Sequence, residues 1–177
     1  MASAAEGQGG PVLLCYDDSD CSRRAIEHAG RVLGGGQGVV LTVWESLGSA
    51  VLRHAPSGTT EFGRDARGIA EDVVDELDAS TAEQAHATAA EGAAFAAVAG
   101  FEARPLARRA LARAAERASV TVWRAVLDAA IEENAELIVL GSRGRSGVTS
   151  MVLGSVSYGV VHNSDRPVLI VPPLPER

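Results

Sequence analysis

Three glycines and a serine follow the apolar run ELIVL, and their spacing is suited to binding an anion. Two residues separate Gly141 from Gly144, nine separate Gly144 from Gly154, and Ser155 stands where the next helix is predicted to begin. Glycine lets the backbone bend and approach a ligand without a β-carbon in the way. Unpaired amides at a helix start favour an anion, and successive loop amides can form a concavity for one. The pattern therefore predicts a phosphate-binding loop.

Polar and charged side chains near this loop suggest how such a ligand would be oriented. Arg143 and Arg145 could screen phosphate charge, and the Ser155 hydroxyl could donate a hydrogen bond. Asp17 has the wrong sign for phosphate, but a carboxylate suits hydrogen bonds from ribose hydroxyls. Three simpler interpretations stay open: the loop only joins a strand to a helix, the arginines are merely solvated, and Asp17 caps a helix.

Apolar runs separated by helical patterns show which elements must position these residues. Strands are predicted at 11–16, 39–45, 136–141 and 166–173, and helices at 21–33, 61–99, 119–134 and 155–164. The long Ala- and Glu-rich helix is either continuous or broken near Ser80 or Gly92. Helical spacing groups Val32, Leu33 and Ile131 with the apolar residues of their helices.

The segment 101–118 is ambiguous. Propensity favours a helix after Pro105, whereas Pro105 also suits an edge strand. The alternation of the remaining elements predicts a doubly wound α/β fold, a parallel sheet covered by helices on both faces. A single domain is expected over 11–173, with a flexible lead at 1–10 and a short tail at 174–177.

Such sheets bind ligands at the carboxyl ends of their strands, where the strand order reverses. The first predicted strand ends in Asp17, and the strand at 136–141 ends in the glycine loop. If these two strands are neighbours, their loops form one crevice.

Composition and charge exclude several classes of protein. The net charge is −7, from 16 basic and 23 acidic residues, which argues against a nonspecific nucleic-acid-binding protein. All 16 basic residues are arginine, which excludes chemistry that needs a lysine, such as a Walker motif or a Schiff base. The sequence shows neither a membrane-spanning run nor a secretory signal, so a cytoplasmic location without membrane contact is expected. Cys15 and Cys21 are expected to be reduced thiols.

The sequence resembles the universal stress protein family over about residues 11–173. The stretch GSRGRSGVTSMVLGSVSYGVVHNSDRPVLIVP is similar to the carboxyl-terminal nucleotide motif of that family. VLLCYDDSDCSRRAIEHA resembles its first strand, acidic residue and first helix, and VVLTVWE matches its second strand. The resemblance implies five parallel strands in the order 3-2-1-4-5 with four helices. It makes 101–108 the third strand, against local propensity.

The resemblance also implies a ligand, because family members with the full glycine motif bind ATP, and often AMP or ADP. Carried over by position, Asp17 would contact the ribose or adenine side, and Cys15 and Val43 would line the adenine pocket. The ribose and phosphates would be surrounded by Leu140, Gly141, Arg143, Gly144, Gly154, Ser155 and Val156. The family usually forms homodimers through its last strand, here Val168 to Val171.

Asp18 departs from the family pattern, which usually has glycine at this position. A second carboxylate beside the phosphates would repel them unless a divalent cation such as Mg²⁺ lies between, so Mg²⁺ is an optional part of the predicted ligand. Hydrolysis would need a placed water and a base, and His28, His54, His86 and His162 form no recognisable catalytic motif.

The predicted function is therefore that of a non-enzymatic, nucleotide-dependent binding protein in stress response or signalling. Two alternatives stay open. One is a slow ATPase or a nucleotide-cleaving enzyme of the same superfamily. The other is a protein-interaction module that needs no nucleotide.

Overall fold

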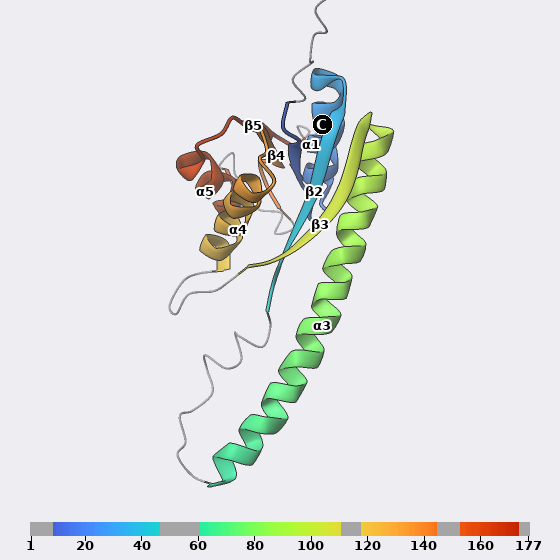
Figure 1. The fold of residues 1–177 in the computed structure, drawn as a ribbon. Coiled ribbons are helices and arrows are strands. Elements are labelled where there is room, and N and C mark those ends of the chain that lie inside the picture. The colour runs from blue at the N-terminus through green and yellow to red at the C-terminus, as the bar shows by residue number, and fades with distance from the viewer. Residues whose placement is uncertain (1–8, 47–60, 111–117, 145–152, 174–177) are drawn as a thin grey trace, which may run out of the picture.

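The structure, a computed structural model, describes residues 9–46, 61–110, 118–144 and 153–173, with backbone alone for 61–72 and 118–121. Parallel strands form one sheet in the order β3-β2-β1-β4-β5 (Figure 1). The strands are β1 (Val12–Cys15), β2 (Gly36–Glu45), β3 (Phe101–Ala110), β4 (Leu137–Gly141) and β5 (Val168–Val171). The helices are α1 (Asp20–Leu33), α3 (Glu61–Val98), α4 (Ala118–Glu132) and α5 (Ser155–Asn163). The predicted doubly wound fold and its strand order are confirmed.

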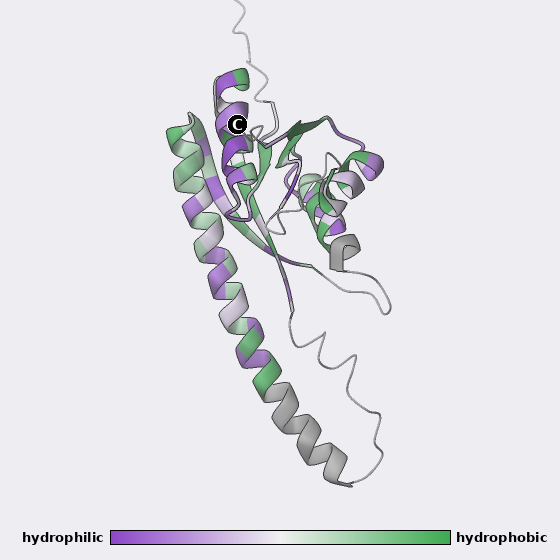
Figure 2. Cartoon of the chain, turned by 180° about the vertical axis from the view of Figure 1, so that it is seen from behind, coloured by the Kyte–Doolittle hydropathy of each residue, from purple (hydrophilic) through white to green (hydrophobic). Residues whose placement is uncertain are grey.

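Two hydrophobic cores hold the sheet between its helices. Successive residues of a strand point to opposite faces, so Leu14 and Val40 pack on the side of α1 and α3. Their neighbours Leu13 and Val39 pack on the side of α4 and α5. Figure 2 shows hydrophobic residues in the central strands and hydrophilic residues along α1. With both faces covered, the polar residues that follow the strands gather at the carboxyl edge of the sheet.

The segment 101–110 is a strand, as the family resemblance implied and as helix propensity did not. β3 pairs with β2 in parallel over its whole length of 10 residues. Tertiary pairing of this extent overrides the local preference. Pro105 keeps its place in the ladder opposite Val40, so the missing N–H of the proline belongs to the outer edge of the strand.

The helix α3 runs without a break for 38 residues, so the alternative of a break near Ser80 or Gly92 is wrong. Its C-terminal half packs on the sheet, and its N-terminal half extends past it (Figure 1). Gly92 allows this packing, because a β-carbon there would stand 2.6 Å from Tyr16 Cδ1 and 2.8 Å from Val40 Cγ1. The glycine therefore marks a close approach of helix to sheet.

Three apolar residues that the helical spacing grouped with the buried faces lie at the surface. Val32 is 61% exposed, Leu33 is 42% exposed and Ile131 is 54% exposed. All three stand near the C-terminal ends of α1 and α4. The spacing of apolar residues predicted both helices correctly, but it did not show which of these residues are buried.

Several predicted features lie outside the described residues. They are residues 1–8 of the expected lead, the tail at 174–177, His54 and Arg145. Within the part of the chain that the structure describes, no helix has the length and apolar character needed to cross a membrane.

We predict that Gly92→Ala destabilises the protein, although alanine is the better helix former by about 1 kcal/mol. The added β-carbon would press on the Tyr16 ring and Val40, and overpacking of this kind costs roughly 1–3 kcal/mol. Urea denaturation would measure the free energy of unfolding. Ser80→Ala, at an exposed position of the same helix, is the matched control and should be neutral or slightly stabilising. A Gly92→Ala variant more stable than the wild type would contradict the close approach.

Candidate functional site

A cleft of about 580 Å³ opens at the carboxyl ends of β1, β2 and β4. β1 and β4 are neighbours in the sheet, so the loops that follow them meet there, as predicted. Apart from Arg145, which lies outside the described residues, the structure brings together the residues that the sequence singled out for a ligand: Cys15, Asp17, Val43, Leu140, Gly141, Arg143, Gly144, Gly154, Ser155 and Val156. The residues of the lining that sequence reasoning missed are Tyr16, Ser22, Leu41, Glu45, Val122, Val126 and Ser157.

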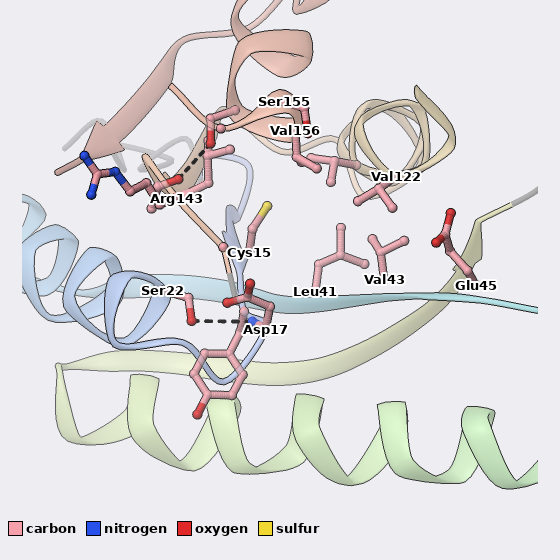
Figure 3. A pocket seen from close by; sticks show the side chains of 17 residues that line it. Cys15, Asp17, Ser22, Leu41, Val43, Glu45, Val122, Arg143, Ser155 and Val156 are labelled. Atoms are coloured by element: carbon pink, nitrogen blue, oxygen red, sulfur yellow. Dashed lines mark hydrogen bonds between the residues drawn. The ribbon is translucent and has the colours of Figure 1, made fainter. Parts of the chain in front are cut away.

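Apolar side chains form a slot in one half of this cleft. Leu41 and Val43 lie along β2 and make its floor, and Val122 of α4 lies opposite Val43 (Figure 3). Val156, from the start of α5, continues the roof toward the glycine loop. A narrow apolar slot with polar groups at its ends is the usual form of a small-molecule site.

Two periodic patterns in the sequence could have indicated the missed residues of α4 and β2. Val122 and Val126 are four residues apart, which is the spacing of one helix face. Leu41, Val43 and Glu45 alternate along β2, which is the spacing of one strand face. Neither pattern by itself shows that the face lines a cleft, because a core residue has the same spacing.

Asp17 is held in place by the start of α1. Its Oδ1 accepts hydrogen bonds from the Ser19 amide at 3.2 Å and from the Ser19 hydroxyl at 2.6 Å. Its own amide donates to Ser22 Oγ at 3.4 Å (Figure 3). Ser19 is the N-cap of α1, because its side chain accepts a hydrogen bond from the Ser22 amide. Asp17 therefore orients the capping residue instead of capping the helix itself, and these bonds fix its carboxylate at the cleft.

Asp18 is not among the residues that line the cleft, contrary to the expected conflict with phosphate. Its φ of 65° lies in the left-handed region, which explains why glycine suits this position. Its carboxylate pairs with Arg23 and accepts a hydrogen bond from the Tyr16 hydroxyl at 3.2 Å. Arg23 also pairs with Glu91 of α3 at 3.1 Å, which ties the turn to the neighbouring helix.

This arrangement removes the repulsion on which the expectation of a bridging Mg²⁺ rested. In addition, no group of three or more His, Cys, Asp and Glu side chains within the described residues could hold a metal ion. Beside its apolar slot, the described lining thus offers amides, hydroxyls, a thiol and isolated charges.

The helix α5 begins at the cleft without a capping side chain. Its N-cap is Gly154, which offers no side-chain acceptor to the first helical amides. The Gly154 amide is itself paired, contrary to the prediction, because it donates to the Ser142 carbonyl at 2.8 Å. The amides of Ser155 and Val156 come next, at the positive end of the helix dipole and in the cleft wall. This end of the cleft is therefore suited to an anion.

Gly141 and Gly144 allow close packing within the protein. A β-carbon on Gly141 would stand 2.9 Å from backbone and side-chain atoms of Cys21, and one on Gly144 would stand 2.9 Å from Asp17 Oδ2. The sequence argument explained these glycines by the approach of a ligand, whereas the structure shows the loop lying against α1 and the Asp17 carboxylate. Arg143, between them, directs its guanidinium away from the apolar slot (Figure 3).

Cys15 lies between the apolar slot and Asp17. Burial raises the pKa of the Cys15 thiol to about 12, and the charge of Asp17 adds to the rise. The group is therefore a neutral thiol near pH 7, a small polarisable surface instead of a nucleophile. Cys21 is buried in α1, and both cysteines are free thiols in the structure.

The described histidines lie away from the cleft lining. His162 stacks on Tyr158 at the surface of α5, with ring centroids 3.9 Å apart. His28 belongs to α1, and His86 is exposed on α3. The titratable side chains of the described lining are those of Cys15, Tyr16, Asp17, Glu45 and Arg143.

Comparison with known sequences shows a relationship along nearly the whole chain. The profile of the universal stress protein family matches residues 10–172. A universal stress protein of Mycolicibacterium smegmatis is 44% identical over 61 residues, which cover 34% of this chain and 19% of that relative. The similar segment thus spans about a fifth of the relative's length.

Solved structures show the same fold. The universal stress protein UspA of Lactobacillus plantarum is 16% identical, with a TM-score of 0.58 over 93% of this chain and 98% of that chain. A universal stress protein solved in complex with cAMP is 26% identical, with a TM-score of 0.52 over 93% of this chain and 97% of that chain. The profile match, the strand order and these structural likenesses together show that this chain belongs to the universal stress protein family.

Proposed function

We propose that this protein binds ATP, or AMP or ADP, in the cleft between β1 and β4, and that it acts in the cytoplasm as a nucleotide-dependent binding protein in stress response or signalling. One observation carries the proposal: the start of α5 opens onto the cleft beside Asp17 with no capping side chain. Helical amides without a cap bind phosphate, and a fixed carboxylate binds sugar hydroxyls. The two groups together suit a nucleotide better than a simple anion.

The order of groups along the cleft supports this assignment. The apolar slot between Val43 and Val122 would hold the base, and Asp17 would accept hydrogen bonds from the ribose. The phosphates would lie at Ser155 and Gly144, with Arg143 near the mouth. The relative that was solved with cAMP supports an adenine nucleotide as the ligand.

We propose binding without efficient turnover. Hydrolysis requires a group that orients water and additional charge stabilisation in the transition state. Asp17 lies beside Gly144, and its Oδ1 already accepts two hydrogen bonds from Ser19. A slow ATPase would release ADP over many turnovers, whereas a sensor would retain stoichiometric nucleotide, and chromatography of the bound and released nucleotides distinguishes the two.

We predict that Ser155→Asp weakens ATP binding at least tenfold, by placing a carboxylate where the phosphates would lie. The same substitution puts an acidic residue at the start of α5, which should leave the unliganded protein as stable or more stable by about 0.3–1 kcal/mol. Isothermal titration calorimetry measures the affinity, and a thermal melt without ligand measures the stability. These opposite directions separate loss of binding from loss of folding.

Ser80→Asp, at an exposed position on α3, is the matched control for the change in net charge and should bind as the wild type does. Unchanged ATP affinity in Ser155→Asp would overturn the assignment of the phosphate end. Absence of binding by the wild-type protein to ATP, ADP and AMP would favour the interaction module that needs no nucleotide.

We also predict that Cys15 stays unreactive at pH values where ordinary cysteines react. With a pKa of about 12, its thiolate fraction at pH 8 is about a thousandfold lower than that of a thiol with an ordinary pKa of 9.0. In a Cys21→Ala background, the rate of alkylation should rise about tenfold per pH unit from pH 8 to pH 10. Added ATP should lower the rate of alkylation further, because Cys15 lines the cleft that ATP would occupy. A rate that levels off near pH 9 would show that the Cys15 pKa is not raised.

We propose in addition that two copies pair through β5. Carbonyls of Pro167 and Val171 accept hydrogen bonds from the β4 side at 3.0 and 2.9 Å, so the alternation of the strand turns the amides of Val168 and Ile170 outward. An apolar edge strand with outward amides can pair with a second copy. Ile170→Pro removes one outward donor and leaves the bonds to β4.

Sedimentation analysis of Ile170→Pro should show a larger monomer fraction than the wild type. Val161→Ala, an exposed substitution on α5, is the control. A monomeric wild type, or an equally dimeric variant, would contradict pairing through this edge.

A further inference from the structure

Glu45 stands at the end of the cleft farthest from the start of α5. It lies on the same face of β2 as Leu41 and Val43, the two apolar residues of the floor, because strand residues alternate between faces. The strand rise places Glu45 about 7 Å beyond Val43. The stretch LTVWE therefore builds an apolar floor that ends in a carboxylate.

Figure 3 shows how this carboxylate relates to the slot. Val43 and Val122 face each other from β2 and α4, and Glu45 lies just beyond them, with its carboxylate on the side of Val122. Arg143 and Ser155 lie at the opposite end. A planar ring held between the two valines, with its phosphates at α5, would present its far edge to Glu45.

An ionised carboxylate only accepts hydrogen bonds, so it recognises the donors of a ring edge. Adenine carries one such group, the exocyclic amine on C6. We propose that Glu45 accepts a hydrogen bond from this amine and thereby selects adenine over purines that lack it. The assignment rests on the proposed nucleotide site and adds the residue that reads the base.

The test compares AMP with purine riboside 5′-monophosphate, which lacks only the amine. The wild type should bind AMP about tenfold more tightly, as expected for a hydrogen bond to a charged acceptor at a solvent-accessible position. In Glu45→Ala this ratio should fall to about one. Removing a negative charge should raise the affinity for both monophosphates alike, so the ratio isolates the contact with the base.

Two further variants sharpen the comparison. Glu45→Gln keeps a carbonyl acceptor without the charge, so an intermediate ratio is expected. Glu83→Ala removes an exposed carboxylate of α3 and should leave the wild-type ratio unchanged. Isothermal titration calorimetry gives both affinities for each protein.

The outcomes separate this inference from the proposed function. Equal binding of the two monophosphates by the wild type would overturn the role of Glu45 and leave the nucleotide site intact. A preference for AMP over purine riboside 5′-monophosphate that persists in Glu45→Ala would also overturn the role of Glu45 and leave the nucleotide site intact. Binding of neither monophosphate by the wild type, together with no binding of ATP or ADP, would overturn the nucleotide site itself.

Discussion

The pairing of β1 with β4 is the constraint on which the cleft depends. From β1 the chain continues into α1 on one face of the sheet, and α5, which follows β4 in the described fold, lies on the other. The two strands are adjacent, yet the helices that follow them diverge, and the space between the helices opens at the carboxyl edge. The contact of Gly144 with the Asp17 carboxylate shows how closely the two loops then approach. A side chain at Gly144 would press on this carboxylate.

The helices that follow β1 and β4 begin at this edge of the sheet, and their starts differ in what they offer a ligand. The start of α1 is capped by Ser19 and carries Asp20 in its first turn, so its amides and its dipole are already matched by protein groups. The start of α5 has glycine at the N-cap and no acidic residue in its first turn. Of these two helices, α5 thus presents the positive end of its dipole to the cleft, whereas α1 holds the carboxylate of Asp17 in place. The cleft therefore has a positive side at the start of α5 and a negative side at Asp17.

Sequence reasoning was most accurate where a pattern has a single physical cause. Buried parallel strands read as continuous apolar runs, so β1, β4 and β5 were predicted to within a few residues. The segment of β3 was predicted only through the family resemblance, because its arginines and alanines carry no apolar pattern and its extended form depends on pairing with β2. The course of α3 past Gly92 could not be predicted, since the reason for that glycine is the ring of Tyr16, which is remote in the sequence.

The same limit applied at the cleft. The glycine loop and Asp17 were found because their residue types are unusual after a strand. Asp18 was expected beside the phosphates, because its position in the sequence does not reveal the left-handed turn that directs it to Arg23. Glu45 was missed because an acidic residue at the end of a strand is ordinary in a sequence, and the role proposed for it depends on the approach of Val122 across the slot.

The two edges of the sheet are unequal, which bears on the behaviour of the protein at high concentration. The outer edge of β3 carries Pro105, whose ring interrupts the row of donors that an added strand would need. Strand addition is therefore possible at one side only, and a second copy that occupies that side leaves no further edge to extend. In the proposed pair through β5, addition of further strands would therefore end after a single step.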